Sequence, residues 1–170
     1  MAEFKKIDPR DISDNVFKAI GDEWMLITAV NSKNKVNTMT ASWGGLGVLW
    51  NKPVCFCFVR PQRYTNEFIR DSQRLTLSVL DATNREALKI CGTKSGRDCD
   101  KISEAGLDII NSCGIAYFEQ SRLVIVAKKI YVDRLDENSF VDRVLVDKNY
   151  PMRDFHDVYV CEIEEVMIKD

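Results

Sequence analysis

The 170-residue sequence has one histidine, His156, and lacks any long apolar run. A single histidine excludes metal centres that need several histidines and catalysis that needs two of them. The longest apolar-rich runs, residues 24–30 and 53–59, fall far short of the roughly 20 residues that span a bilayer. No apolar stretch follows the N-terminal Met-Ala-Glu-Phe-Lys-Lys, so we expect no signal peptide.

The sequence also lacks an excess of charge. Lysine plus arginine number 24 and aspartate plus glutamate number 26, which gives a net charge of −2. This balance argues against a nucleic-acid or anionic membrane partner held by overall charge. A hydrophobic fraction of 45% and a charged fraction of 29% are typical of a globular protein. The length predicts a single domain over residues 1–170, and the six cysteines indicate reduced thiols in the cytoplasm.

Several familiar nucleotide-binding and catalytic motifs are missing. The sequence has no P-loop, no Gly-x-Gly-x-x-Gly after a strand and no Gly-x-Ser-x-Gly. Cys55 and Cys57 lie on one face of an expected strand, but no second pair is near them in the sequence. We therefore expect buried thiols there rather than a metal site.

The pattern of apolar residues predicts a mainly β protein. Strands are expected over 24–30, 36–42, 53–59, 74–80, 122–135 and 158–168. Helices are expected over 65–72, 84–91 and 98–105, and a lead-in over 1–23 should hold one short helix that ends at Gly21. The second strand should be broken by Gly44, Gly45 and Gly47. Short turns between the early strands favour an antiparallel sheet closed as a barrel, with helices on its outside.

Three segments have compositions that suggest a binding site rather than a purely structural role. Residues 37–44 combine small and hydroxyl side chains at a strand end, which leaves the backbone approachable for a flat ligand. Residues 60–65, Arg-Pro-Gln-Arg-Tyr-Thr, place two arginines at a turn before a helix, where a phosphate fits. Residues 93–101 gather three cations around a glycine. Each segment alone also fits a polar turn or a capped helix. Together they suit a flat ring with a phosphate tail, such as flavin mononucleotide (FMN).

The same segments carry a resemblance to a known family. Thr-Met-Thr-Ala-Ser-Trp (38–43), Val-Arg-Pro-Gln-Arg-Tyr-Thr (59–65) and Ser-Gly-Arg-Asp-Cys-Asp-Lys (95–101) resemble the flavin reductase-like family of split-barrel FMN-binding proteins, which includes flavoredoxin. The order and spacing of these segments agree with that family over about residues 22–168. The resemblance implies a six-stranded antiparallel split β-barrel of Greek-key type with short peripheral helices.

The resemblance also implies a cofactor, a partner and residue roles. FMN, in preference to FAD, would lie in a groove near the interface of a homodimer. Its isoalloxazine ring would be lined by Met39, Thr40, Ala41, Ser42 and Trp43. Its phosphate and ribityl chain would be held by Arg60, Arg63, Tyr64 and Thr65, with Pro61 setting the turn. Further contacts would come from Ser95, Gly96, Arg97 and Lys101.

The role of His156 and the type of reaction stay open at this point. The family often has a histidine close to the nicotinamide position, and His156 is the candidate. The alternative is an exposed turn histidine that titrates near neutrality. Members commonly pass hydride from NADH or NADPH to flavin, so we expect an NAD(P)H:flavin oxidoreductase. A flavoredoxin-like FMN electron carrier without its own nicotinamide site is the second hypothesis, and a barrel that binds no flavin and acts through protein contacts is the third.

Overall fold

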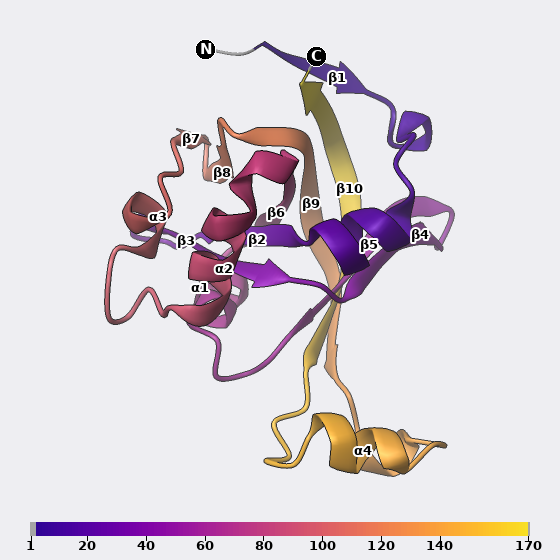
Figure 1. The fold of residues 1–170 in the computed structure, drawn as a ribbon. Helices are drawn as coiled ribbons and strands as arrows, with labels where there is room; N and C mark the ends of the chain where they lie inside the picture. The colour runs from indigo at the N-terminus through magenta and orange to yellow at the C-terminus, as the bar shows by residue number, and fades with distance from the viewer. Residues whose placement is uncertain (1–2, 170) are drawn as a thin grey trace.

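The computed structural model describes residues 3–169, and an eight-stranded antiparallel sheet forms its centre (Figure 1). The strands follow the order β3-β2-β6-β9-β10-β5-β4, and β1 pairs with the end of β10. Their bounds are β1 Phe4–Ile7, β2 Met25–Val30, β3 Val36–Ala41, β4 Gly44–Leu49, β5 Lys52–Val59, β6 Arg74–Leu80, β9 Ser121–Arg134 and β10 Asp157–Lys169. A separate hairpin pairs β7 (Ile109–Ser112) with β8 (Ile115–Phe118). The predicted domain and lead-in include residues 1, 2 and 170, which lie outside the described residues.

The prediction of a mainly β, antiparallel split barrel is confirmed, and all six expected strands are present. The sheet has eight strands rather than six because the sequence analysis missed β1 and β4. The prediction that glycines break the chain after β3 is wrong, since these glycines form β4 alongside β5. A Cβ atom on Gly44 would lie 2.9 Å from the carbonyl oxygen of Phe56, so glycine allows the two strands to approach. The interruption falls instead at Ser42 and Trp43.

A row of buried apolar side chains ties β3 to the centre of the sheet. Met39 pairs with Ile27, Ile27 with Leu77, and Leu77 with Ile125, so the row crosses four strands. All four side chains are buried in one core cluster. Burying each contributes on the order of 1.5–3 kcal/mol. The residues that alternate with this row in β3 point to the other face, as a strand period of two requires.

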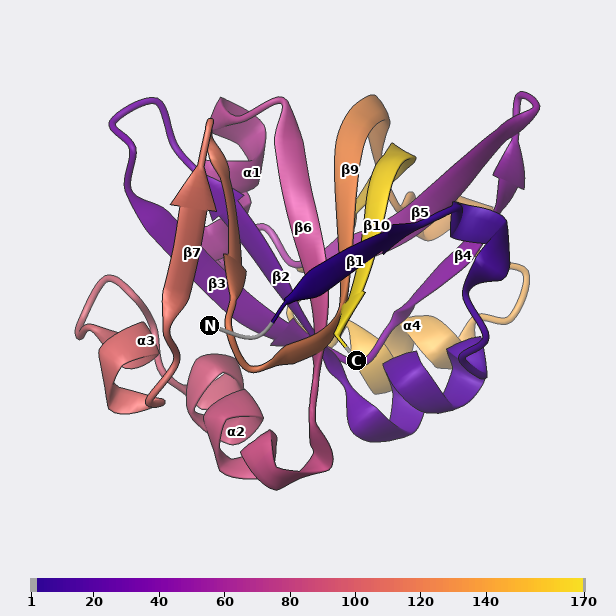
Figure 2. The same cartoon turned by 90° about the horizontal axis from the view of Figure 1, so that it is seen from above.

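Short helices flank the sheet, as Figure 2 shows from above. The expected helices appear as α1 (Tyr64–Asp71), α2 (Arg85–Thr93) and α3 (Lys101–Glu104), the last beginning three residues later than predicted. The lead-in contains a π-helix over Lys18–Glu23, which continues through Gly21 because that glycine keeps a helical backbone. The prediction that Gly21 ends the helix is therefore wrong. Among residues 3–169, no helix is long and apolar enough to cross a membrane.

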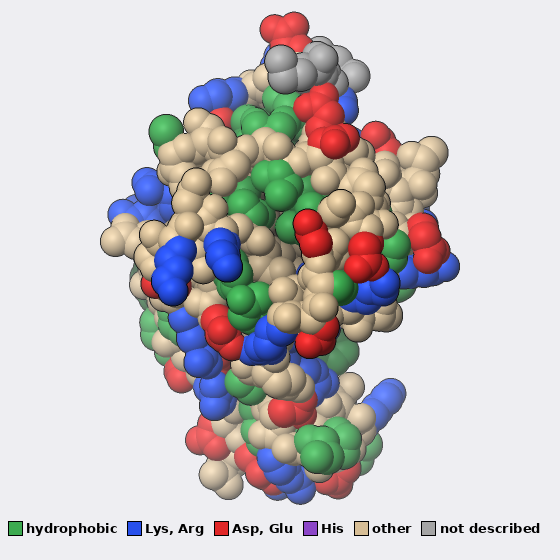
Figure 3. Space-filling model, turned by 90° about the vertical axis from the view of Figure 1, so that its left-hand side faces the viewer, with side chains coloured by type: hydrophobic (Ala, Val, Ile, Leu, Met, Phe, Trp, Pro, Cys, Tyr) green, Lys and Arg blue, Asp and Glu red, His purple; other side chains and the backbone are tan. Residues whose placement is uncertain are grey.

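The strands β9 and β10 run past the body and end in an arm, residues 135–156, which projects away from it (Figure 1). The arm contains a 3-10 turn over Glu137–Ser139 and the helix α4 (Val144–Asn149). Its own apolar cluster consists of Val146, Tyr150 and Phe155, with Leu135 and Phe140 packed against them. Figure 3 shows the arm as a lower lobe with apolar side chains on its surface. The sequence analysis predicted no element in this segment.

A buried carboxylate at the start of β10 connects β9, β10 and α1. Asp157 accepts hydrogen bonds from Asn66 Nδ2 at 2.8 Å, Arg70 at 2.5 Å and Arg134 at 2.8 Å. Burial opposes ionisation of Asp157, but these donors outweigh it and lower its pKa. Asn66 Nδ2 also donates to the carbonyl oxygen of Arg60 at 3.2 Å. The carboxylate therefore fixes the turn between β5 and α1, which is the turn that leads into the site.

Candidate functional site

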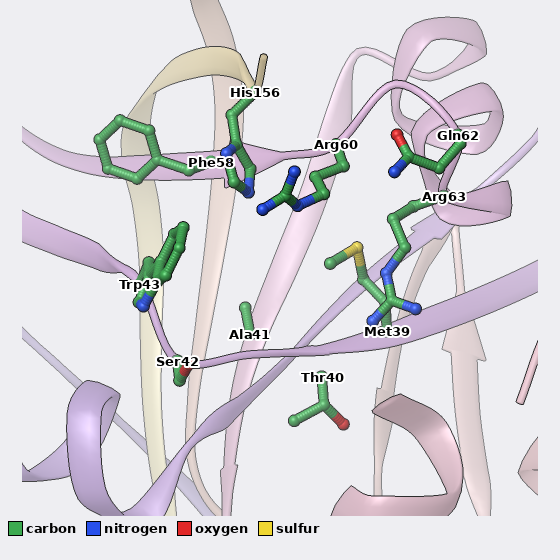
Figure 4. Close-up of a pocket in the computed structure, with 10 residues that line it drawn as sticks. All are labelled: Met39, Thr40, Ala41, Ser42, Trp43, Phe58, Arg60, Gln62, Arg63 and His156. Carbon is green, nitrogen blue, oxygen red and sulfur yellow. The ribbon is translucent and has the colours of Figure 1, made fainter. Parts of the chain in front are cut away.

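The largest part of the candidate site is a pocket of about 440 Å³ at the split in the barrel. One wall is β3, the first strand in the sheet order, with which only β2 pairs in the described part of the chain. The opposite wall comes from the end of β5 and from His156 (Figure 4). We call this the first pocket, and its lining residues are Met39, Thr40, Ala41, Ser42, Trp43, Phe58, Arg60, Gln62, Arg63 and His156.

A second pocket of about 320 Å³ continues from the first. The two share Met39, Gln62 and Arg63, so they form one groove with two ends. The second pocket lies between the start of α1 and the segment 93–101. Its other lining residues are Tyr64, Thr65, Thr93, Lys94, Ser95, Arg97, Asp98 and Lys101. Four cations line this end of the groove, namely Arg63, Lys94, Arg97 and Lys101, whereas Arg60 and Arg63 are the cations of the first pocket.

The groove brings together nearly all the site residues that the sequence predicted. Every one of them lines the first or the second pocket except Pro61 and Gly96. Gly96 instead has a packing reason to be glycine, because a Cβ atom there would lie 2.3 Å from Asn37 Oδ1. Neither Thr65 nor Asn66, the polar residues near the start of α1, caps that helix. Arg63 is the N-cap residue, Thr65 Oγ1 accepts from Asn37 Nδ2 at 2.9 Å, and Asn66 binds Asp157.

The β3 wall presents backbone as well as side chains to the groove. Figure 4 shows Met39 and Ala41 pointing into the pocket and Thr40 pointing away from it. The Thr40 hydroxyl donates to the Leu88 carbonyl oxygen of α2 at 2.5 Å, and a Cβ on Gly92 would lie 3.3 Å from Thr40 Cβ. The helix α2 thus holds β3 from behind. Because β3 has no strand partner on its pocket side among the described residues, its backbone groups there can bind a ligand edge.

Two cations, the buried Lys101 and the half-buried Arg63, define the second pocket. Arg63 Nη2 donates to the Gly92 carbonyl oxygen at 2.9 Å, and Lys101 Nζ donates to the carbonyl oxygens of Cys91 and Lys94 at 2.9 and 3.0 Å. Burial lowers the pKa of Arg63, and burial together with nearby Arg63 lowers the pKa of Lys101 to about 8. Among residues 3–169, neither cation forms an ion pair with a carboxylate. Two desolvated positive charges without a counter-ion make this end of the groove a favourable place for an anion.

Arg97 lies at the rim of the second pocket in a different environment. It forms an ion pair with Glu67, donates to the Gln62 carbonyl oxygen at 3.2 Å, and lies 4.7 Å from the centre of the Tyr64 ring. Its charge is therefore partly compensated and largely exposed. Arg97 shapes the rim, while Arg63 and Lys101 supply the uncompensated charge.

The arm supplies the remaining wall of the first pocket. The imidazole of His156 is buried, lies 5.2 Å from the Trp43 ring, and shares a hydrogen bond of 2.7 Å between Nδ1 and the Tyr150 hydroxyl. Burial, reinforced by the positive charge of Arg60, lowers the pKa of His156 to about 4. The alternative of an exposed histidine that titrates near neutrality is therefore wrong. His156 is a neutral imidazole in the pocket wall.

The sequence analysis missed some of the lining residues. Phe58 is the alternate residue before Arg60 at the end of β5, and Gln62 sits inside the arginine turn. Both positions could have been found by extending the predicted strand face and turn. Thr93, Lys94 and Asp98 belong to a segment already singled out, but not as contact residues. Nothing in the sequence indicated that the arm would bring Tyr150 to His156.

The chain is thus an antiparallel split barrel with a groove between β3 and the end of β5, and this is the fold class of flavin reductase-like proteins. The model of the flavin reductase-like domain matches residues 17–170, and the chain belongs to this family. No curated protein matches the sequence.

Solved structures agree with this assignment. An FMN-binding domain of a flavin reductase-like enzyme from Shewanella baltica OS155 superposes with a TM-score of 0.69 at 13% identity, covering 99% of this chain and 78% of that one. Flavoredoxin of Desulfovibrio vulgaris (Miyazaki F) gives 0.69 at 17% identity, covering 96% and 78%. An FMN-binding protein from Thermus thermophilus, with bound p-hydroxybenzaldehyde, gives 0.67 at 16% identity, covering 100% and 83%. At these identities the likeness establishes the fold.

The burial of His156 leads to a testable titration. We expect its ring signals in NMR spectra of the folded protein to titrate with a midpoint of about 4. A histidine in an unfolded chain titrates at about 6.5, so the unfolded chain binds the extra proton between these values. The free energy of unfolding should therefore rise with pH across that window and level off above it. The protein in urea is the control, and equal midpoints in the folded and unfolded states would contradict the buried placement.

Proposed function

We propose that this protein binds FMN in the groove and transfers hydride from NADH or NADPH to flavin. The observation that carries the proposal is the pairing of a flat pocket beside an open strand edge with a second pocket that holds two uncompensated cations. This arrangement fits a planar ring at one end and a phosphate at the other. Relatives of the same fold are described as FMN-binding or as flavoredoxin, which supports the choice of ligand.

The residues of the groove form two sets, one that would contact the ring of FMN and one that would contact its phosphate. The ring would lie against Met39, Ala41 and Trp43, with backbone groups of β3 at its edge. The phosphate would meet Arg63 and Lys101, with the Thr65 and Ser95 hydroxyls beside them. Relatives of the same fold are described as FMN-binding, which supports FMN in preference to FAD. When bound, the flavin would supply the atom that accepts hydride.

The protein's own part in this chemistry is binding, orientation and electrostatics. Backbone N–H groups on the pocket side of β3 would donate to the ring edge and stabilise negative charge there, as in an oxyanion hole. Trp43 and Phe58 would exclude water from one side of the ring. With a pKa of about 4, His156 is neutral near pH 7, so it would help shape the nicotinamide side without acting as an acid. Hydride transfer requires no further acid or base from the chain.

The phosphate assignment predicts a selective loss in one variant. Each hydrogen bond between a guanidinium and a phosphate contributes about 1.5–3 kcal/mol, so Arg63→Ala should raise the Kd for FMN by about 10- to 100-fold. Riboflavin, which has no phosphate, should bind wild type and variant alike. Fluorescence titration with both flavins measures this difference. The control is Arg10→Ala, an exposed arginine at the N-terminal edge. An unchanged Kd for FMN in Arg63→Ala would refute the assignment.

The hydride step is tested with the protein reconstituted with FMN. NADH or NADPH is added under air, and the loss of nicotinamide absorbance is followed against free FMN as the control. We expect oxidation of one donor well above the control rate. No oxidation with either donor would contradict a flavin reductase and favour an electron carrier, the function that the name of the flavoredoxin neighbour describes. A protein that takes up no FMN would leave only a role in protein contacts.

We also propose that the protein forms a homodimer through an apolar surface near the β4–β5 hairpin. Val48 is 76% exposed and Trp50 58% exposed, while Tyr131 and Val132 of β9 are 45% and 51% exposed. Trp50 and Tyr131 lie 6.3 Å apart between ring centres, so this is one patch. Contiguous exposed apolar surface of this kind supports association with a second copy. Sedimentation should give twice the 19.5 kDa chain mass, and Trp50→Glu should shift it towards the monomer. A monomeric wild type would contradict this.

A further inference from the structure

The contacts of Arg60 differ from those of Arg63 and Lys101, which donate to backbone carbonyl oxygens and have no carboxylate partner in the described part of the chain. Arg60 Nη2 donates to the Asn149 carbonyl oxygen at 2.8 Å, and its Nη1 forms an ion pair of 2.6 Å with Asp154. The guanidinium also lies 5.1 Å from the centre of the Tyr150 ring. All three partners belong to the arm. Arg60 is therefore held from the side opposite the segment 93–101.

The position of Arg60 along the groove also separates it from Arg63 and Lys101. Arg60 lines the first pocket and not the second, whereas Arg63 lines both. Figure 4 shows the Arg60 guanidinium between His156 and Arg63, facing the space above Ala41. The carboxylate of Asp154 already neutralises part of the charge of Arg60, so Arg60 attracts a phosphate less strongly than Arg63 or Lys101 does. Both position and charge separate Arg60 from the anion site.

We propose that Arg60 acts on the ring end of the cofactor rather than on its phosphate, and that the arm positions it there through Asp154 and Tyr150. This inference rests on the proposed function, since it assigns Arg60 within the same groove. It replaces the expectation, drawn from family resemblance, that Arg60 holds the phosphate or ribityl chain.

The consequence is electrostatic. A positive charge beside a flavin ring stabilises the reduced form, which carries more negative charge than the oxidised form. Asp154 lies against the same guanidinium and offsets part of that effect. The balance of Arg60 and Asp154 therefore sets the redox potential of the bound ring. Because Asp154 belongs to the arm, the arm becomes part of the redox site even though it projects from the body.

The first test compares the two flavins in two matched variants. Arg60→Gln should raise the Kd for FMN and for riboflavin by the same factor, about tenfold for one lost contact to a charged group. Arg63→Gln should raise the Kd for FMN alone. If Arg60→Gln weakens FMN and spares riboflavin, Arg60 is a phosphate ligand and the inference is overturned. If it weakens neither, the inference is overturned as well.

The second test measures the midpoint potential of bound FMN. Arg60→Gln should lower it. Asp154→Asn should raise it, because asparagine keeps an oxygen that accepts from Arg60, and Asn149 still holds the guanidinium, while the opposing negative charge is gone. Shifts in the same direction, or none in either variant, would overturn the inference. Circular dichroism melting of each variant shows that it folds, and Asp154→Asn provides an independent measurement if Arg60→Gln does not.

A third measurement needs no flavin and separates this inference from the proposed function. Arg60 lies beside His156 in the pocket wall opposite β3, with Asp154 and Asp157 as the other charged groups nearby. Removing the arginine charge should raise the NMR titration midpoint of His156 above its value in the wild type. If wild type binds neither flavin, the proposed function fails, while this shift still reports whether the arm holds Arg60 in the first pocket. An unshifted midpoint would place Arg60 elsewhere.

Discussion

The hydrogen bond between Asp157 and Asn66 is the contact on which the geometry of the groove depends. Asp157 begins β10, and Asn66 lies in the first turn of α1, so one buried carboxylate joins two elements that are far apart in the sequence. Asn66 also binds the carbonyl oxygen of Arg60, and Tyr159 Oη donates to Asn66 Oδ1 at 2.5 Å. The turn from Arg60 to Arg63 is thus held by the sheet itself. Both arginines start from a backbone that has little freedom to move.

The cations of the groove fall into two groups according to how their charge is balanced. Arg60 and Arg97 each have a carboxylate partner, whereas Arg63 and Lys101 donate to backbone carbonyl oxygens. Burying a cation without a counter-ion is costly, and the lowered pKa of Lys101 reflects that cost. A protein that keeps two such groups together gains stability when an anion arrives. The balanced cations can shape the groove whether or not a ligand is present.

The sequence predicted the strands and most of the site because their signals are local. Apolar and β-rich runs, of which residues 74–80 alternate and 53–59 are continuous, predicted six strands. The short segments around Thr40, Arg63 and Lys101 each carried their own chemistry. What it could not predict depends on contacts between distant segments. In the sequence, Gly44 is typical of a residue that ends a strand. The structure shows a different reason for the glycine, because a Cβ atom there would lie 2.9 Å from the carbonyl oxygen of Phe56 in β5. The arm was missed because α4 is one short helix, and because the Asn149 carbonyl oxygen that binds Arg60 is a backbone group present at every residue.

The position of β3 at the end of the sheet has a further consequence for the empty protein. An exposed strand edge is a template on which another chain can add its own strand, which is a common beginning of aggregation. In the described part of this chain, the outer side of β3 opens into the groove, where a ligand would cover it. A ligand in the groove would therefore shield this edge from pairing with another chain as well as occupy the site.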